Sequence, residues 1–192
     1  MNENYKILSE IIRKRRSISP DHFLQNEIPV QLLEEVLSNA IYAPNHKKTQ
    51  PWRFKIIRRN KKDALSAFLS QQYELNTSKE EFNEIKFRKA GEKAMQSNCI
   101  ILLCLDRSPV SIIPEWEETA ALACAVQNIW LSCTALGIGA YWSTPAAIKK
   151  MGEFIPLLDT EECLGLFYCG WTNFDPVPYS RKSLSEVCSW YE

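Results

Sequence analysis

A chain of 192 residues is long enough to form one domain with a sizeable core. Its 23 basic and 23 acidic residues balance, which argues against nucleic acid or an anionic membrane surface as a partner and makes any anion site local. The sequence has no segment apolar enough to span a bilayer and no signal-peptide core near its start, so we expect a cytoplasmic protein.

The first two predicted elements are helices. Residues 4–16 carry apolar side chains at helical spacing and end in a basic cluster, and Pro20 prevents the helix from continuing. The clearest helix spans residues 29–42, with Pro29 in its first turn and Pro44 directly after it.

The middle of the chain mixes strands and helices. A polar loop at 43–51 leads into a strand at 52–58, and a helix is expected over 61–71. Residues 72–95 are charged and weakly periodic, which predicts a helical excursion with poor order that could act as a lid. The continuous apolar run 99–105 is typical of a strand covered on both faces.

The last part of the chain begins with a long Ala-, Leu- and Val-rich helix at 115–136, expected to be buried at the centre. Strands follow at 139–144 and 163–170, with a short helix between them, and a proline-containing arm covers 171–192. Three or four strands with five or six helices, and no repeat or long linker, predict a single α+β sandwich over residues 1–192.

The sequence offers little independent catalytic chemistry. Its seven cysteines form no Cys-x-x-Cys pair and mostly lie in apolar runs, which favours buried reduced thiols over a zinc cluster. His22 and His46 are not at metal-ligand spacing, so no metal site is predicted. Glycine-rich nucleotide motifs and a strand-embedded nucleophile are absent from the sequence, and nothing picks out the serine of a hydrolase. We therefore predict no catalytic side chain.

Three segments could bind a ligand, and each also has a purely structural interpretation. The Arg-Arg-Ser run at 15–17 could hold a phosphate, or could form a solvated basic face at a helix end. The loop 43–51 carries several donors, or is a polar connection anchored by Trp52. Residues 137–145 combine glycines with the flat face of Trp142, or form a helix cap and a core strand.

Taken together and in this order, the segments resemble the nitroreductase family, most closely its compact single-domain bacterial members. The matching runs are Arg-Arg-Ser at 15–17, Ala-Pro-x-His-Lys-x-x-Gln-Pro-Trp-x-Phe at 43–54 and Pro-x-Trp-Glu at 114–117. Their order and spacing hold from about residue 8 to 170. The resemblance implies an α+β sandwich with a mixed or antiparallel central sheet flanked by helices, in a homodimer with swapped terminal arms.

The resemblance also implies two FMN molecules per dimer, each held at the subunit interface. One group of residues would contact the FMN phosphate and ribityl chain, and a second would lie along the isoalloxazine ring. Others would reach the flavin from the partner subunit. Apart from the resemblance, we hypothesise that Lys48 or His46 supplies positive charge near the flavin N1–O2 edge. The phosphate and ribityl contacts would be Arg15, Arg16, Ser17 and Arg181. The residues along the ring would be Trp142, Ser143 and Thr144. Tyr42 and His46 would come from the partner subunit, and Lys48 is the further candidate for positive charge.

The end of the long helix matches a stretch that contacts the nicotinamide dinucleotide in relatives. The implied activity is that of an FMN-dependent NAD(P)H oxidoreductase, in which hydride from NADH or NADPH passes through flavin N5 to a nitroaromatic, quinone or enone acceptor in a ping-pong cycle. The implied nicotinamide contacts are Ser132, Cys133, Thr134, Ala135, Leu136 and Gly137.

The chain also departs from the family pattern. Ser19 stands where many relatives have Arg or Lys, Lys48 where many have Asn, and Thr144-Pro145 where Gly-Gly is common. FMN binding is expected to survive these changes. They leave the reduction potential of the flavin and the choice of substrate without a prediction. Two alternatives to the enzyme are a non-catalytic flavin carrier or sensor with the same fold, and a partner-docking α+β domain whose basic cluster binds an acidic protein.

Overall fold

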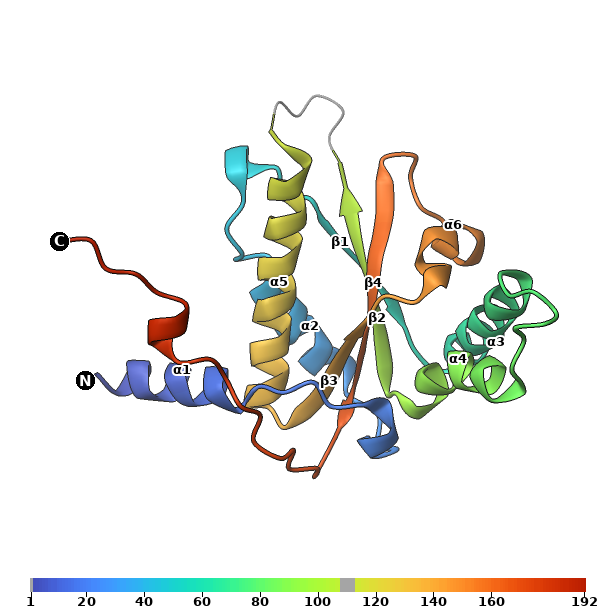
Figure 1. Ribbon diagram of the computed structural model, residues 1–192, viewed down its shortest axis with the longest axis horizontal. Coiled ribbons are helices and arrows are strands. Elements are labelled where there is room, and N and C mark those ends of the chain that lie inside the picture. The colour runs from blue at the N-terminus through green and yellow to red at the C-terminus, as the bar shows by residue number, and fades with distance from the viewer. Residues whose placement is uncertain (1, 108–112) are drawn as a thin grey trace.

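The computed structural model describes residues 2–107 and 113–192 (Figure 1). Within these residues a four-stranded, wholly antiparallel sheet with the order β1-β2-β4-β3 forms the centre of the fold. The predicted α+β architecture is confirmed, and the sheet is antiparallel rather than mixed. The strands are Trp52–Ile57 (β1), Cys99–Asp106 (β2), Ile138–Ser143 (β3) and Glu161–Trp171 (β4).

The strand β2 is buried along almost its whole length, as its continuous apolar run predicts. It pairs with β1 on one side and β4 on the other. Because side chains alternate along a strand, Ile101 and Leu103 join the core on one face of the sheet, while Ile100 and Leu102 join the core on the other. The sheet therefore needs a helical layer on each face.

Helices supply both layers (Figure 1). One core contains residues of α2 (Val30–Ala40) and of the long central helix α5 (Glu115–Ala135). The other contains residues of α3 (Asn60–Leu75), α4 (Glu84–Gln96) and the short α6 (Met151–Phe154). Gly137, at a φ of 74°, follows α5 and permits the sharp turn into β3.

The predicted helical excursion over residues 72–95 corresponds to the end of α3 and to α4, which fills most of the rest. The side chain of Asn83 caps α4 by accepting the backbone N–H groups of Ile85 and Lys86. Gly91 allows close helix packing, because a Cβ there would overlap the side chain and backbone of Ser66. Capping and a small residue at the contact thus order a segment whose periodicity alone is weak.

The two ends of the chain stand apart from the packed layers. Helix α1 (Glu3–Lys14) has no buried residue, and its apolar Ile7, Leu8 and Ile12 are exposed. The C-terminal arm, residues 172–192, contains one short 3-10 turn and extends on the same side of the molecule as α1 (Figure 1). None of the helices in the described ranges is long and apolar enough to cross a membrane.

Candidate functional site

A cavity of about 740 Å³ lies between the end of α1, the middle of α5 and the C-terminal arm. It brings together the predicted phosphate-binding residues 15–17 and Arg181, which come from opposite ends of the chain. None of the described residues lining it is acidic, so its positive charge has no carboxylate in the lining to balance it. The lining residues are Ile12, Arg13, Arg15, Arg16, Ser17, Gln127, Trp130, Tyr179 and Arg181.

Arg15 occupies a half-buried position in this arginine cavity. Its guanidinium carbon lies 4.7 Å from the centre of the Trp130 ring, an arrangement typical of a cation–π contact. Burial lowers the pKa of Arg15, and the charges of Arg181 and Arg16 lower it further. A bound anion would offset this repulsion, because it would place opposite charge among the guanidinium groups.

The guanidinium group of Arg16 donates to carbonyl oxygens at the end of α1, while its buried Nε has no acceptor among the described residues. Its Nη1 donates to the carbonyl oxygens of Arg13, at 2.5 Å, and Arg15, at 2.9 Å. Its own carbonyl accepts the indole N–H of Trp130 at 3.2 Å. The Nε of Arg16 is buried and has no hydrogen-bond partner among the described residues. A buried donor of this kind calls for an acceptor, which a phosphate or ribityl oxygen could supply.

Sequence reasoning missed five residues of the cavity, of which Ile12 was noted only for the apolar face of the first helix. Gln127 gave a signal, since it is a polar residue inside an otherwise apolar central helix, and Trp130 lies nearly one helical turn further on. Tyr179 gave none, because no local pattern places the arm beside α1; its ring lies 5.1 Å from the Arg181 guanidinium carbon. Arg13 was visible as part of the basic cluster without a role of its own.

Trp142 is linked to the arginine cavity through the sheet. It pairs in register with Phe167 on β4, and the Phe167 ring meets the Trp130 ring edge-on with centroids 5.3 Å apart. The Trp142 indole lies across Gly165, where a Cβ would overlap it, and its buried Nε1 has no partner among the described residues. The next two predicted residues, the half-buried Ser143 and the exposed Thr144, continue from the end of β3.

Tyr42, His46 and Lys48 lie elsewhere in the same chain. The Nδ1 of His46 is 2.6 Å from the Oε2 of Glu117, in the first turn of α5. Since a helix rises 1.5 Å per residue, Glu117 and Trp130 are separated by about 20 Å along α5. Tyr42 and Lys48 are exposed, and neither lines the arginine cavity. One chain alone therefore does not gather all the predicted flavin residues.

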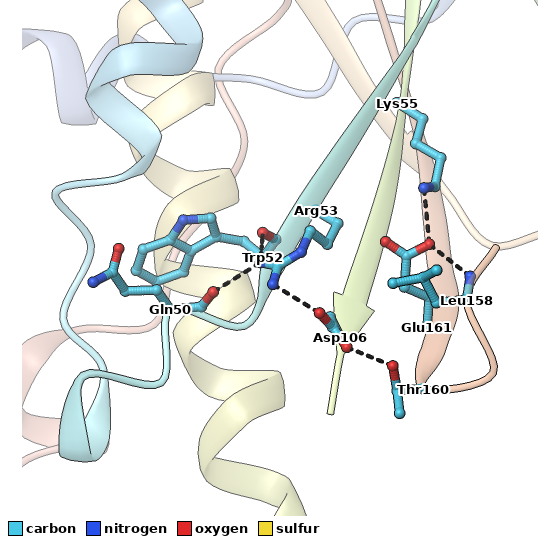
Figure 2. Close-up of polar contacts among 8 residues, drawn as sticks. All are labelled: Gln50, Trp52, Arg53, Lys55, Asp106, Leu158, Thr160 and Glu161. Atoms are coloured by element: carbon cyan, nitrogen blue, oxygen red, sulfur yellow. Dashed lines mark hydrogen bonds and ion pairs between the residues drawn. The ribbon is translucent and has the colours of Figure 1, made fainter. Parts of the chain in front are cut away.

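The loop that carries His46 is anchored to the sheet at its far end (Figure 2). Arg53 donates to the carbonyl oxygens of Gln50, at 3.0 Å, and Trp52, at 2.9 Å, and to the carboxylate of Asp106 at 2.7 Å. The other oxygen of Asp106 accepts the hydroxyl of Thr160 at 2.7 Å. These bonds tie the end of the loop to β2 and to the segment before β4.

A buried ion pair crosses the same end of the sheet (Figure 2). Lys55 on β1 lies 2.8 Å from the nearly buried carboxylate of Glu161 on β4, which also accepts the backbone N–H of Leu158 at 3.1 Å. The pair thus links β1 to β4 across the intervening strand β2.

The predicted nicotinamide stretch, residues 132–137, does not face one cavity. Cys133 is 1% exposed, so it is not accessible to a ligand, and burial raises its pKa to about 12. Thr134 and Gly137 line a second cavity of about 730 Å³ between α1 and the start of the arm. Ser132, Ala135 and Leu136 line a groove beside α1 and α2.

The cysteines form no disulfide or metal site among the described residues. The predicted buried thiols are confirmed at five positions, while Cys124 is exposed on α5 and Cys188 is half-buried in the arm. All seven thiols are free. Within residues 2–107 and 113–192, no group of three or more His, Cys, Asp and Glu side chains is arranged to hold a metal ion. The buried cysteines are Cys99, Cys104, Cys133, Cys163 and Cys169.

Comparison with known proteins agrees with this geometry. Among curated proteins, "Putative NAD(P)H nitroreductase YfhC" of Bacillus subtilis (strain 168) is 26% identical over 186 residues, covering 95% of this chain and 93% of the relative. Among solved structures, a nitroreductase-like family protein from Bacillus cereus superposes with a TM-score of 0.78 at 23% identity, with 96% of each chain covered. The FMN-dependent nitroreductase NfnB from Mycobacterium smegmatis, solved in complex with NADPH, superposes with a TM-score of 0.79 at 14% identity over 99% of this chain and 100% of NfnB.

The family assignment rests on a match that spans most of the chain. The family model described as "Nitroreductase family" covers residues 12–171, which include the arginine run, the polar loop, α5 and all four strands. The resemblance drawn from three short motifs is thereby confirmed over the whole packed core. The chain belongs to the nitroreductase family of oxidoreductases.

Proposed function

We propose that this protein is an FMN-dependent NAD(P)H oxidoreductase that works as a homodimer and reduces a small-molecule acceptor. The observation that carries the proposal is the arginine cavity, where Arg13, Arg15, Arg16 and Arg181 line a space with no acidic residue in its described lining. Four guanidinium groups around one space suit a phosphate dianion, because each can make charge-assisted hydrogen bonds to its oxygens.

The residues around the cavity fit FMN on physical grounds. The unpartnered Nε of Arg16 is a buried donor that a phosphate or ribityl oxygen would satisfy. Ser17 adds a hydroxyl at the lining, and Arg181 brings a guanidinium from the arm. Arg15 is already oriented by Trp130, so little conformational freedom is lost when it binds an anion.

The ring system would lie toward Trp142, Ser143 and Thr144 at the end of β3. FMN, when bound, supplies the hydride chemistry, accepting from a nicotinamide and donating to an oxidant. The chain itself contributes binding, orientation and charge, and needs neither a nucleophile nor a metal for this role. Lys48 and His46 are our candidates for positive charge and hydrogen bonds near the flavin N1–O2 edge.

Two observations support a homodimer with shared sites. The apolar face of α1 is exposed in a single chain, as are Val177, Tyr179 and Trp190 of the arm, which leaves a surface that a second copy could cover. His46 is held by Glu117, about 20 Å along α5 from Trp130, and Tyr42 and Lys48 do not line the arginine cavity of their own chain. We propose that they reach the flavin of the partner subunit across a two-fold axis.

The electron donor and acceptor belong to the same proposal. The curated relative is named as an NAD(P)H nitroreductase and NfnB was solved with NADPH, which favours a nicotinamide donor here. Within residues 132–137, the accessible ones, which exclude the buried Cys133, are proposed to contact it. Nitroaromatics, quinones and enones are proposed as acceptors, since each can receive a hydride or electrons from a reduced flavin.

Anaerobic spectroscopy of the purified protein tests the proposal. We expect it to bind FMN, to lose the visible flavin band on addition of NADH or NADPH, and to regain it when a nitroaromatic or quinone is added. FMN binding without bleaching by either nucleotide would instead identify a flavin carrier or sensor. Failure to bind added FMN at all would favour the docking domain and overturn the proposal.

A further inference from the structure

The hydrogen bond between His46 and Glu117 has no role in the function proposed so far. It joins the Nδ1 of His46 to the Oε2 of Glu117 at 2.6 Å, across 71 residues of sequence. The Glu117 side chain is 23% exposed and that of His46 is 52% exposed. In the described ranges, His46 is the side chain that forms a hydrogen bond with the Glu117 carboxylate.

Stability alone is a poor reason for this contact. A pair with one partner half-exposed to water is screened by solvent, so its contribution to the free energy of unfolding is small. Its geometric consequence is larger, because a carboxylate that accepts from Nδ1 keeps the proton on that nitrogen. The ring plane is then fixed, and Nε2 is the nitrogen left for another group.

The loop around His46 is held in an unusual conformation. Lys47, Lys48 and Gln50 all have positive φ values, of 49°, 57° and 45°, which are uncommon for residues other than glycine. Such backbone persists where its surroundings determine it. Here the side chain of Glu117 holds one end of the loop and that of Arg53 holds the other.

We propose that Glu117 is a positioning residue, which holds the Nδ1–H of His46 and so fixes its ring. Nε2 is thereby presented to the flavin of the partner subunit, as an acceptor in the neutral ring and as a donor in the imidazolium. This inference rests on the proposed function, since His46 needs a flavin to act on. Glu117 does not touch the flavin in this scheme; it acts through the imidazole, as a second-layer carboxylate does for a histidine that binds a metal.

Nitrogen NMR of the imidazoles tests the first half of the proposal without any turnover. The chain has two histidines, so a His22→Ala variant assigns both rings. We expect neutral His46 to carry its proton on Nδ1 in the unaltered protein and in Glu117→Gln, whose amide oxygen still accepts. In Glu117→Ala that preference should be lost. Glu115→Ala is the matched control, because it removes an acidic residue from the same first turn without contacting His46. An unchanged tautomer in Glu117→Ala overturns the proposal.

A double-mutant cycle on FMN binding tests the second half. His46→Ala should weaken FMN binding roughly tenfold, as expected for one hydrogen bond to a polar ligand. If Glu117 acts through His46, Glu117→Ala should weaken it less, and the double variant should match His46→Ala alone. Additive losses would show that Glu117 acts independently and overturn the proposal. A protein that binds no FMN but shows the expected tautomer would count against the proposed function and leave the Glu117–His46 relationship standing.

Discussion

Arg15 and Arg181 are neighbours in space although they lie at opposite ends of the chain, and after burial the charge of Arg181 is the next cause that lowers the pKa of Arg15. Both line the same cavity. Like charges held this close destabilise the empty site, so binding of an anion removes a repulsion as well as adding an attraction. The first prediction follows from this relationship.

Arg15→Ala should weaken FMN binding by about tenfold or more, because one charge-assisted hydrogen bond is lost. Arg15→Lys should lie between the alanine variant and the unaltered protein, since lysine keeps the charge but not the planar contact with Trp130. Titration with FMN and with riboflavin measures the effect, and only FMN should be affected strongly. Arg59→Ala, at an exposed arginine outside the cavity, is the control. Equal losses for FMN and riboflavin would argue against a phosphate contact.

Shared sites predict complementation between two defective variants. Arg15→Ala damages the arginine cavity and His46→Ala damages the contribution to the partner. A mixed dimer then has one intact site and one doubly damaged site, and random mixing should restore about a quarter of the tight FMN sites. Mixing Arg15→Ala with Arg16→Ala is the control and should restore none. The same lack of recovery in the first mixture would place His46 and Arg15 in one chain's site.

The exposed apolar face of α1 predicts how the dimer can be broken. Leu8 is 51% exposed, and Leu8→Glu places a charge where the partner is proposed to pack. We expect the dimer dissociation constant to rise at least about tenfold, with FMN affinity falling in parallel. Leu158→Glu changes another exposed leucine, which is 63% exposed and lies before β4, and should leave the dimer intact. Light scattering over a dilution series distinguishes these outcomes, and a protein that is monomeric without substitution would contradict the homodimer.

The contact between Gly165 and Trp142 predicts a packing effect at the place proposed for the flavin ring. The Cβ added by Gly165→Ala would overlap the Trp142 indole, coming within 2.8 Å of its Cδ1, and would force that ring to move. Overpacking of this kind costs about 1–3 kcal/mol of unfolding free energy. Urea unfolding followed by tryptophan fluorescence measures it. Gly152→Ala should be neutral or stabilising, because its Cβ would meet nothing closer than 3.9 Å. Equal stability of the two variants would refute the account.

The buried thiol of Cys133 predicts a loss of stability in alkali. Burial and then the neighbouring Cys99 raise its pKa from 9.0 to about 12. The unfolded thiol loses its proton first, so stability is complete below pH 9.0 and falls between pH 9.0 and about 12, by up to about 1.4 kcal/mol per pH unit. Urea unfolding of Cys133→Ala under reducing conditions should show a shallower decline over this range. Cys124→Ala, at an exposed thiol, should follow the unaltered protein.

Local pattern was sufficient for most of the packed core. The apolar run of β2 predicted a strand covered on both faces, and the predicted central helix differs from α5 by one residue, with Gly137 at the turn after it. These elements follow local rules of periodicity and capping. Their agreement with the structure explains why short motifs sufficed to identify the family.

Features that depend on contacts distant in sequence were not predictable in this way. Tyr179 joins the cavity only because the arm returns to α1, and no spacing near residue 179 encodes that path. The order of α4 depends on the fit of Gly91 against Ser66 of another helix. His46 was singled out by its motif, but its partner Glu117 lies in a different segment and becomes visible only in the folded chain.

The lack of buried residues in α1 has a consequence for the protein inside a cell. A twelve-residue helix with no buried residue is marginal in water. In an isolated copy the arginines after it would be held mainly by the contacts of Arg15 and Arg16 with Trp130. The sheet and its two cores would stay folded on dilution while the phosphate end of the site frayed. Cofactor loading would then depend on how many copies are synthesised, and scarce protein would lose its flavin long before it unfolded.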